Sequence, residues 1–348
     1  MTLTRNREIL LTLTIAGVIA TGCVQTPAIP TATGVPLAVS ATTVVTIGCA
    51  EGPDSVSVAS ENLVPEGVEF DPTLCRFLLG SLSSGNVVAV TDDGSVSVLT
   101  NDDELASSVG LHLDDRRLLV CCRLASGAPG LGIYSADDGS RIALVDLTSV
   151  AGAGSHMAND CTADGDGNAY VTDSRSTKIY RVTPAGVASV FLDNAAFATS
   201  GVSLNGIEFI PGDNVLVVAV SGLGRLFRIP LDDPESFSEV AIAQSVFGDG
   251  VALHPSGDLI VVGSASFNSV GTLTGVFALA SDDGWQTANV NGIVTTSAAG
   301  TTSALRGTDV YVTFPFIASF NLGTTIDAYP LLRIATEEGM SGVAKPIR

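Results

Sequence analysis

The chain has 348 residues, of which 16 are Lys or Arg and 36 are Asp or Glu, so its formal net charge at pH 7 is −20. A surface this negative repels nucleic acids and anionic membranes, and we exclude both as partners. The 37 glycines, the low aromatic content of 5% and the many Val, Thr and Ser residues are typical of an all-β protein with many turns.

The N-terminus is predicted to be processed, with a signal peptide over 1–23 and a flexible linker over 24–37. Two arginines precede an apolar run that is too short to span a bilayer comfortably. The small residues before Cys23 resemble a bacterial lipoprotein signal, in which Cys23 is acylated after cleavage. Ordinary secretion with cleavage near Ala20 or Ala28 stays open. The protein is therefore predicted to be exported (secreted, periplasmic or in the cell envelope), with Cys23 as its one attachment to a membrane.

A short phrase returns five times along the chain: any residue, Gly (Asp160 in the third copy), an apolar residue, any residue, an apolar residue, then a turn and an apolar strand. Its first positions lie at intervals of 43, 50, 46 and 44 residues and are Glu66, Val109, Asn159, Asn205 and Asp249. A period of this length with four short strands per unit indicates a β-propeller. Equivalent positions of successive blades then meet around one central axis.

Each unit contains apolar strands separated by glycine-containing turns. The first unit has strands predicted at 66–70, 76–80, 86–90 and 96–100, and the last two flank the turn Asp92-Asp93-Gly94. Later units repeat this pattern, with turns at 137–139, 184–186 and 282–284.

A sixth unit is present in degraded form, because Ala or Thr replaces the acid or amide at its opening position. It runs over 299–305 into a strand at 307–312. The alternating residues 38–45 are predicted to supply an N-terminal strand that completes the last blade and hides the sheet edges. The sequence thus predicts one domain over 38–348, an all-β, six-bladed β-propeller closed by an N-terminal strand.

Five cysteines remain after Cys23, at positions 49, 75, 121, 122 and 161. Five is an odd number, so they cannot all pair within one chain. We expect buried thiols, with one disulfide, for example between Cys49 and Cys75, left open.

Four first positions of the repeat carry a candidate metal site: Glu66, Asn159, Asn205 and Asp249. Together they offer carboxylate and amide oxygens, which suit Ca²⁺ and less well Mg²⁺ or Mn²⁺; another divalent ion such as Zn²⁺ is the remaining alternative. Four protein ligands leave coordination positions open for water or substrate, as a Lewis-acid catalyst requires. The competing interpretation is that Asn-Gly and Asp-Gly are ordinary turn dipeptides in a polar channel.

Over about 64–312 the chain resembles the family of senescence marker protein, gluconolactonase and luciferin-regenerating enzyme. Diisopropylfluorophosphatase is a more distant relative with the same six-bladed architecture. The resemblance implies calcium or another divalent ion deep in the channel, with Glu66, Asn205 and Asp249 as direct ligands and Asn159 as a ligand or a substrate contact. The motifs that carry it are Pro65-Glu66-Gly67, Asn159-Asp160, Asn205-Gly206 and Asp249-Gly250.

One departure from the family concerns the substrate. Sugar-lactone hydrolases of this type carry an arginine two residues before the asparagine, where Met157 stands here. We therefore expect a less polar lactone or ester, with His156, Met157 and Asn159 as substrate-binding residues. A hydrolytic triad of Ser155, His156 and Asp160 is disfavoured, because neighbouring residues on a strand point apart.

The predicted function is metal-dependent hydrolysis of a small-molecule lactone or ester by a monomeric enzyme. The cation polarises the substrate carbonyl, and Asp249 acts as general base or nucleophile. A non-catalytic propeller that binds a ligand or protein and uses calcium only structurally stays open. A strictosidine-synthase-like enzyme is disfavoured, since Glu337 and Glu338 lie too near the C-terminus to line the channel.

Overall fold

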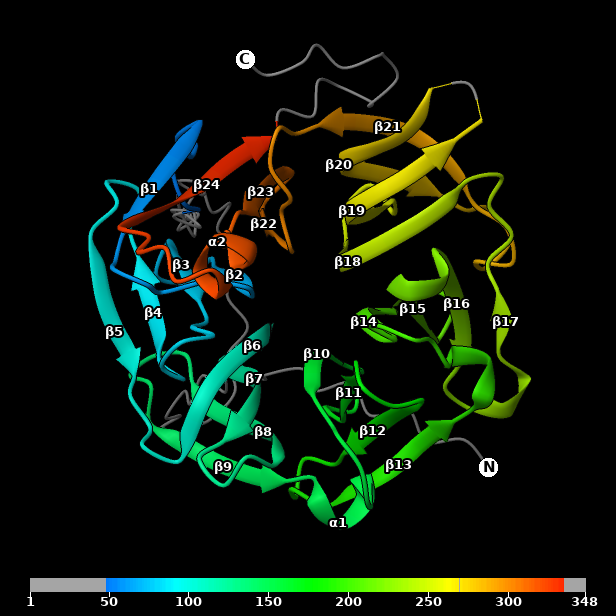
Figure 1. The fold of residues 1–348 in the computed structure, drawn as a ribbon, viewed down its shortest axis with the longest axis horizontal. Coiled ribbons are helices and arrows are strands. Elements are labelled where there is room, and N and C mark those ends of the chain that lie inside the picture. The colour runs from blue at the N-terminus through cyan, green and yellow to red at the C-terminus, as the bar shows by residue number, and fades with distance from the viewer. Residues whose placement is uncertain (1–47, 269, 335–348) are drawn as a thin grey trace, which may run out of the picture. The chain divides into compact units, whose positions relative to one another are not determined.

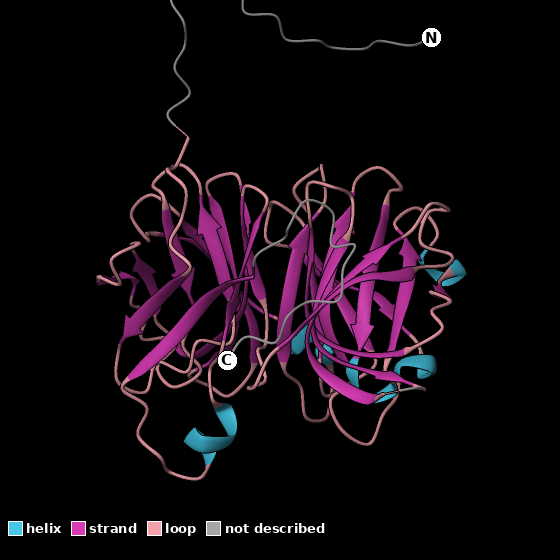
Figure 2. Ribbon diagram, turned by 90° about the horizontal axis from the view of Figure 1, so that it is seen from above, coloured by secondary structure: helices cyan, strands magenta, loops and turns pink. Residues whose placement is uncertain are grey.

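The computed structural model describes residues 48–268 and 270–334. Six four-stranded antiparallel sheets form a ring around a central channel, with β2 (Val68–Asp71), β6 (Leu105–Asp114), β10 (Ala158–Ala163), β14 (Leu204–Ile210), β18 (Ser245–Leu253) and β22 (Ser303–Arg306) nearest the axis (Figure 1). Figure 2 shows this ring from the side, with the strands running between its two faces. The predicted six-bladed β-propeller is confirmed. The signal peptide, the linker and Cys23 lie outside the described residues.

We number the blades in chain order and list their strands from the axis outward. Blade 1 contains β2 (Val68–Asp71), β3 (Arg76–Leu79), β4 (Val87–Val90) and β5 (Val96–Thr100). Blade 2 contains β6 (Leu105–Asp114), β7 (Arg117–Leu124), β8 (Pro129–Ser135) and β9 (Arg141–Asp146). Blade 3 contains β10 (Ala158–Ala163), β11 (Ala169–Asp173), β12 (Lys178–Val182) and β13 (Ala188–Asp193).

The second half of the ring repeats this order. Blade 4 contains β14 (Leu204–Ile210), β15 (Val215–Val220), β16 (Arg225–Pro230) and β17 (Ser238–Glu239). Blade 5 contains β18 (Ser245–Leu253), β19 (Leu259–Phe267), β20 (Gly271–Ala280) and β21 (Asn289–Thr295). Blade 6 contains β22 (Ser303–Arg306), β23 (Asp309–Thr313), β24 (Ala328–Ile334) and, outermost, β1 (Ser55–Ala59).

Short helical turns lie in the connections between strands. They are α1 (Thr148–Ala151), α2 (Ile317–Asn321), η1 (Ala195–Phe197), η2 (Ser221–Leu223) and η3 (Pro234–Ser236). Among the described residues, no helix combines the length and the apolar character that a membrane span needs.

An N-terminal strand closes the ring, as predicted, but it is a different segment from the one expected. β1 pairs antiparallel with β24, with Ser55 opposite Leu332, and thereby completes blade 6. Its side chains alternate between exposed and buried, so that Val56 and Val58 enter the core. The predicted closing segment 38–45 lies outside the described residues, and the position assigned to it is occupied by Ser55–Ala59.

The hydrophobic core lies between neighbouring blades. The apolar middle strands are buried on both faces, as in β15, whose residues are all buried. Between blades 4 and 5, for example, Val217 and Ala219 belong to the same buried cluster as Val246 and Val261. Similar clusters join each remaining pair of neighbours. Because each blade buries its faces against two others, the ring is stabilised as a unit.

Glycine at the second position of the repeat phrase lets neighbouring inner strands approach closely. A Cβ atom on Gly206 would lie 2.4 Å from the Asp249 carbonyl oxygen, and one on Gly250 would lie 2.2 Å from Thr302 Oγ1. Real Cβ atoms do not approach other atoms this closely, so a larger residue would push two blades apart.

The inner strands also bulge at the repeat phrase. The pairing of β14 with β15 shifts between Leu204 and Ile207, and that of β18 with β19 shifts between Gly248 and Val251. A bulge releases the first two residues of the phrase from ladder pairing and re-aims their side chains. The repeat phrase therefore encodes the wall of the channel.

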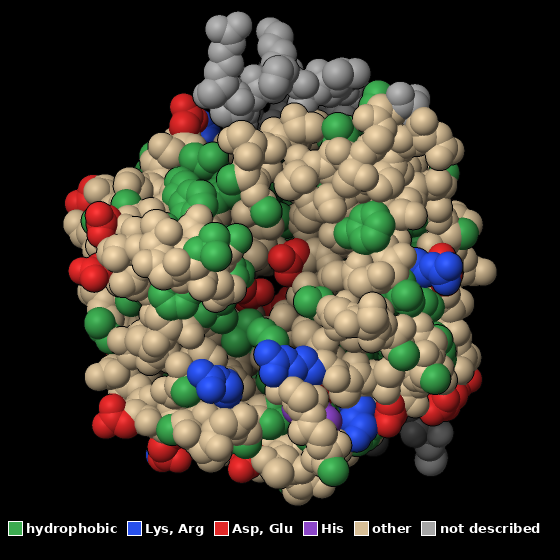
Figure 3. Space-filling view, viewed as in Figure 1, with side chains coloured by type: hydrophobic (Ala, Val, Ile, Leu, Met, Phe, Trp, Pro, Cys, Tyr) green, Lys and Arg blue, Asp and Glu red, His purple; other side chains and the backbone are tan. Residues whose placement is uncertain are grey.

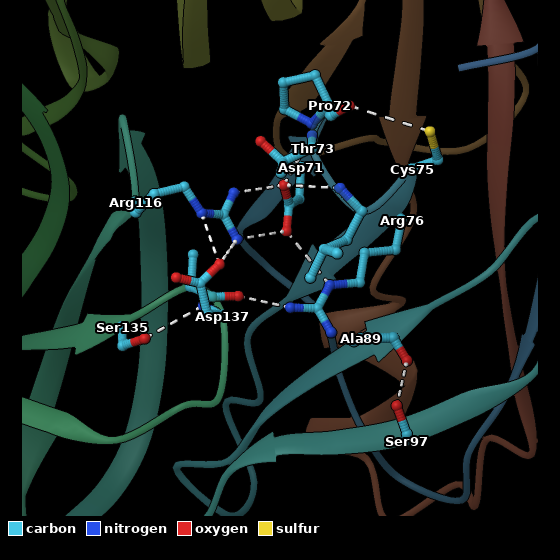
Figure 4. Close-up of polar contacts among 12 residues, drawn as sticks. Asp71, Pro72, Thr73, Cys75, Arg76, Ala89, Ser97, Arg116, Ser135 and Asp137 are labelled. Carbon is cyan, nitrogen blue, oxygen red and sulfur yellow. Dashed lines mark hydrogen bonds and ion pairs between the residues drawn. The ribbon is translucent and has the colours of Figure 1, made fainter. Parts of the chain in front are cut away.

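A network of ion pairs joins blade 1 to blade 2 (Figure 4). The fully buried Asp71 carboxylate accepts hydrogen bonds from Arg116 Nη1 at 2.6 Å and Nη2 at 3.1 Å, and from Arg76 Nε at 3.3 Å. Arg116 also pairs with Asp137 on the surface. Burial by itself would raise the pKa of Asp71, but the hydrogen bonds and charge of Arg116 hold it below its ordinary value.

Two of the five described cysteines form a disulfide and three are free thiols, which agrees with their odd number. Cys49 and Cys75 form a disulfide that fastens the segment before β1 to the turn before β3. Cys121, Cys122 and Cys161 are buried free thiols in strands of blades 2 and 3. They serve as small core residues.

Candidate active site

The four predicted ligand residues all belong to the wall of the channel. Glu66 lies just before β2, and Asn159, Asn205 and Asp249 lie at the bulges of β10, β14 and β18. Glu66, Asn159 and Asn205 are buried, and Asp249 is partly exposed. In the view down the axis, acidic side chains are visible inside the central opening (Figure 3).

Threonines of neighbouring blades hold the backbone at these positions. Thr172 Oγ1 donates to the Asn205 carbonyl oxygen at 2.8 Å, and Thr301 Oγ1 donates to the Glu66 carbonyl oxygen at 2.8 Å. The Gly250 amide donates to the Thr301 carbonyl oxygen at 2.7 Å. Because these bonds satisfy the backbone, the side chains at the first positions are left for the channel.

Asp249 is oriented by a direct contact within this group. Asn205 Nδ2 donates to Asp249 Oδ1 at 2.9 Å. Burial raises the pKa of Asp249 to about 7, and the Asn205 hydrogen bond opposes that shift. Burial, followed by the charges of Asp249 and Asp160, raises the pKa of Glu66 well above its usual value. These carboxyl groups are thus near enough to repel one another when ionised.

Asp160 belongs to this acidic group, although the sequence analysis did not place it among the candidate ligands. It occupies the second position of the repeat phrase, where the other units have Gly, and its Oδ1 accepts from the Cys161 amide at 2.9 Å. Burial raises its pKa to about 7, and the charge of Asp249 adds to the shift. The sequence did contain a signal for this residue, namely Asp in place of the Gly found in the other copies of the phrase. The inner strands are so closely packed at this position that a larger side chain there is unusual.

The donor set fits a hard divalent cation. Asn159 Oδ1 is buried without a hydrogen-bond partner, as a ligand oxygen is when its ion is absent. A cation would also offset the repulsion between Glu66, Asp160 and Asp249. No three or more His, Cys, Asp or Glu side chains in the described part of the chain are arranged as a metal site by themselves, so a cation in this channel would also need amide oxygens as ligands. Oxygen donors suit Ca²⁺, Mg²⁺ or Mn²⁺ better than Zn²⁺.

His156 and Met157 lie beside this group, at the lining of a cavity of about 310 Å³. His156 Nδ1 lies 2.6 Å from Asp173 Oδ2, and the Met157 amide donates to Asp173 Oδ1 at 2.9 Å. Tyr180 Oη also donates to Asp173 Oδ2, at 2.7 Å. His156 therefore pairs with Asp173 and has no part in a triad with Ser155 and Asp160.

Two arginines line the same cavity, and the sequence reasoning missed both. Arg123 comes from the end of β7, and Arg175 follows β11. Neither belongs to the repeat phrase, so the spacing of the repeat gives no hint of them. Polar side chains at other positions therefore accompany Met157 in the cavity lining, and the expectation of a less polar lactone or ester stays a prediction.

A second cavity, of about 210 Å³, lies along the channel at the fourth position of the repeat phrase. Glu69, His112 and Glu208 line it. Burial, followed by the charge of Glu208, raises the pKa of Glu69 to about 8, and burial, followed by the charge of Asp160, does the same for Glu208. Burial lowers the pKa of His112 to about 4. At neutral pH these groups are held largely uncharged.

This second group predicts a pH-dependent stability. An acid with a raised pKa contributes stability that is fully present below its ordinary pKa of 4.5 and is lost as pH rises through about 8. Because Glu208 is partly exposed, we count only half of the rise in its pKa from 4.5 to about 8, and that half corresponds to about 2 kcal/mol of unfolding free energy. With EDTA present, we expect the unfolding free energy to fall between pH 5 and pH 8, and Glu208→Gln to remove about 2 kcal/mol of that fall.

Guanidinium titrations at several pH values measure this slope. Glu235→Gln, which alters an exposed glutamate in η3, is the matched control and should leave the slope unchanged. A Glu208→Gln protein with the wild-type slope would show that Glu208 is ionised in the folded protein at neutral pH.

No protein-family model and no curated protein sequence matches the chain. Solved structures do. The allergen Mala s 1 of Malassezia sympodialis superposes with a TM-score of 0.64 at 20% identity, over 82% of this chain and 97% of that one. A calcium-binding regucalcin from Agrobacterium tumefaciens gives 0.54 at 16% identity, over 83% and 94%. A gluconolactonase from Xanthomonas campestris gives 0.53 at 16% identity, over 82% and 100%.

At these identities the likeness is one of fold. The predicted resemblance to the gluconolactonase family is matched at that level, since gluconolactonase and regucalcin are among the structural neighbours. The chain is therefore a six-bladed β-propeller of the architecture that gluconolactonase, regucalcin and Mala s 1 share.

Proposed function

We propose that the protein is an exported, metal-dependent hydrolase of lactones or related esters. The observation that carries the proposal is the buried, unpartnered Asn159 Oδ1 in the same channel wall as Glu66, Asn205 and Asp249. A buried amide oxygen without a donor is costly, and a cation ligated there removes that cost. The gluconolactonase and regucalcin neighbours support the same chemistry as an analogy of fold.

Glu66, Asn159, Asn205 and Asp249 would hold the cation, and Ca²⁺ suits their oxygens well. When bound, a divalent ion supplies polarisation of the substrate carbonyl and stabilises the oxyanion that develops on it. Asp160 adds negative charge beside this group.

Asp249 is the residue we assign as general base. Its pKa is about 7 without a cation, and a bound cation would lower it, so that the carboxylate would be ionised and able to accept a proton at neutral pH. The Asn205 hydrogen bond fixes one carboxylate oxygen and leaves the other for the attacking water. Direct attack by Asp249 on the carbonyl is the alternative route, and a covalent acyl-enzyme trapped by rapid quenching distinguishes the two.

The signal peptide over 1–23 and the lipid anchor at Cys23 belong to this proposal. We expect the mature protein to be a monomer that acts outside the cytoplasm. Mass spectrometry of membrane and soluble fractions distinguishes an acylated Cys23 from a secreted form cleaved near Ala20 or Ala28.

The test is hydrolysis of a panel of γ- and δ-lactones, aryl esters and one phosphotriester, with CaCl₂ or with EDTA. We expect turnover of at least one lactone or ester, its loss with EDTA, and its recovery with added Ca²⁺. Calcium should also raise the melting temperature. If calcium raises the melting temperature while no substrate is hydrolysed, the site is structural, and the non-catalytic binding propeller is the better description. If Ca²⁺, Mg²⁺ and Mn²⁺, each added alone, neither support hydrolysis nor raise the melting temperature, there is no metal site.

A further inference from the structure

Arg123 and Arg175 reach one cavity from two different blades. Together with His156 they line the inner cavity of about 310 Å³ and also the adjoining outer groove of about 750 Å³. These three side chains thus stand between the outer groove and the inner cavity. Figure 3 shows basic side chains beside the central opening, on the side where Figure 1 has blades 2 and 3.

Both arginines lack an acidic partner in a strongly acidic chain. Arg123 and Arg175 make no ion pair with an Asp or Glu of the described residues, and Arg175 Nη1 donates only to Ser155 Oγ, at 3.1 Å. Most other arginines of the propeller are paired: Arg76, Arg116, Arg117, Arg141, Arg225, Arg306 and Arg333. Two unpaired guanidinium groups at one cavity are the arrangement that an anionic ligand completes.

A third donor points independently to a ligand. The His156 side chain is 8% exposed, and its Nε2 is buried without a hydrogen-bond partner. Asp173 fixes the ring through Nδ1, so that Nε2 is the ring nitrogen left for a ligand in the cavity. Asp146 is the one carboxylate that also lines the outer groove, and it does not line the inner cavity.

Apart from Ser107, the rest of the cavity lining is apolar. Leu82, Cys122, Pro129 and Met157 line it, and so does Val109, the first-position residue of blade 2. Ala158, which precedes Asn159, is also part of the lining. A ligand in this cavity would therefore meet apolar walls beside the two arginines and His156, and Val109 and Ala158 connect the lining to the inner strands of the channel.

We propose that Arg123, Arg175 and His156 form a carboxylate-binding subsite, and that the substrate is a lactone or ester with an apolar body and a free acid group. This inference rests on the proposed hydrolase function for its reacting carbonyl. A neutral substrate would leave both guanidinium groups without a counter-ion. A free acid would otherwise be repelled by Glu66, Asp160 and Asp249.

Binding of a non-reacting pair of probes tests the subsite apart from catalysis. Hexanoate and hexanamide have the same length, and the acid should bind at least 10-fold more tightly in calorimetry or NMR titration. The preference should persist with EDTA, where no bound cation can hold the carboxylate, and should weaken as NaCl rises. Arg123→Gln and Arg175→Gln should each reduce hexanoate affinity about 10-fold and leave hexanamide unchanged.

Arg225→Gln is the matched control, because Arg225 is an exposed arginine of blade 4 paired with Glu239. It should leave hexanoate binding unchanged. Melting temperatures of the three variants check folding; Arg123 and Arg175 are exposed and unpaired by acids, so their replacement should not unfold the protein. Equal affinity for hexanoate and hexanamide, or a preference that Arg225→Gln removes equally, would overturn the subsite. Tighter binding of hexyl phosphate than of hexanoate would overturn the carboxylate assignment.

The outcomes separate the two proposals. Selective, arginine-dependent binding of hexanoate without turnover of any ester would retain the subsite and reject the hydrolase. Hydrolysis with equal kcat/KM for acid-bearing and neutral lactones, unaffected by either arginine variant, would retain the hydrolase and reject the subsite.

Discussion

Asp249→Asn is expected to lower kcat/KM for the best lactone or ester by about 10³-fold or more. The substitution removes the proton acceptor and one charged ligand, while Asn can still accept the hydrogen bond that Asn205 Nδ2 donates to Oδ1. The fold should survive, because the side chain is only partly buried and its amide isostere retains that contact. Initial rates across a substrate titration, with saturating Ca²⁺, measure the effect.

The pH profile identifies the role of Asp249. A general base must be ionised, so kcat/KM should fall as pH drops below the pKa of Asp249, which is about 7 without a cation and lower with one. Asp213→Asn, at an exposed turn between β14 and β15, makes the same chemical change and should leave activity unchanged. An Asp249→Asn enzyme with more than a tenth of wild-type kcat/KM would remove Asp249 from the mechanism.

Arg116→Met is expected to destabilise the propeller by about 3 kcal/mol or more. It leaves the fully buried Asp71 carboxylate without its two shortest charged hydrogen bonds, and Arg76 at 3.3 Å replaces them poorly. Guanidinium unfolding at pH 7 measures the loss. Asp71→Asn in the same chain should recover part of it, because a neutral amide is less costly to bury than an unpaired charge.

The pH dependence of that loss has a defined sign. The pKa of Asp71 is lowered, so its contribution is present above its ordinary value of 3.8 and disappears as pH falls through the lowered pKa. Arg225→Met breaks a half-exposed pair with Glu239, and surface pairs of this kind contribute less than about 1 kcal/mol. If Arg116→Met and Arg225→Met destabilise the protein equally, the buried pair has no special role.

The channel wall could be predicted from the sequence because local chemistry determines it. Gly206 and Gly250 are required by the close approach of inner strands, and Asn205 and Asp249 precede them at the bulges. The repeat of these pairs is therefore visible without a structure. Asp160 was missed because it replaces one of those glycines.

The arginines of the cavity and the position of the closing strand could not be predicted, because both depend on tertiary contacts that the spacing of residues along the chain does not reveal. Arg123 and Arg175 meet at one cavity only because blades 2 and 3 are neighbours in the ring. The closing strand was misplaced for a related reason. Residues 38–45 and Ser55–Ala59 both alternate between small polar or apolar residues, and the register with β24 that selects Ser55–Ala59 is a tertiary contact.

Closure of the ring also sets the order in which the site can be assembled. Thr301 Oγ1 reaches the Glu66 carbonyl oxygen across 235 residues of chain, and Thr313 Oγ1 reaches that of Pro65 across 248. A nascent chain that stops after blade 5 already contains Glu66, Asn159, Asn205 and Asp249, yet it lacks the two threonine hydrogen bonds that hold the backbone at Pro65 and Glu66. The proposed cation site would therefore be complete only once blade 6 has been synthesised and has met blade 1, and we expect a chain truncated after blade 5 to bind neither cation nor substrate.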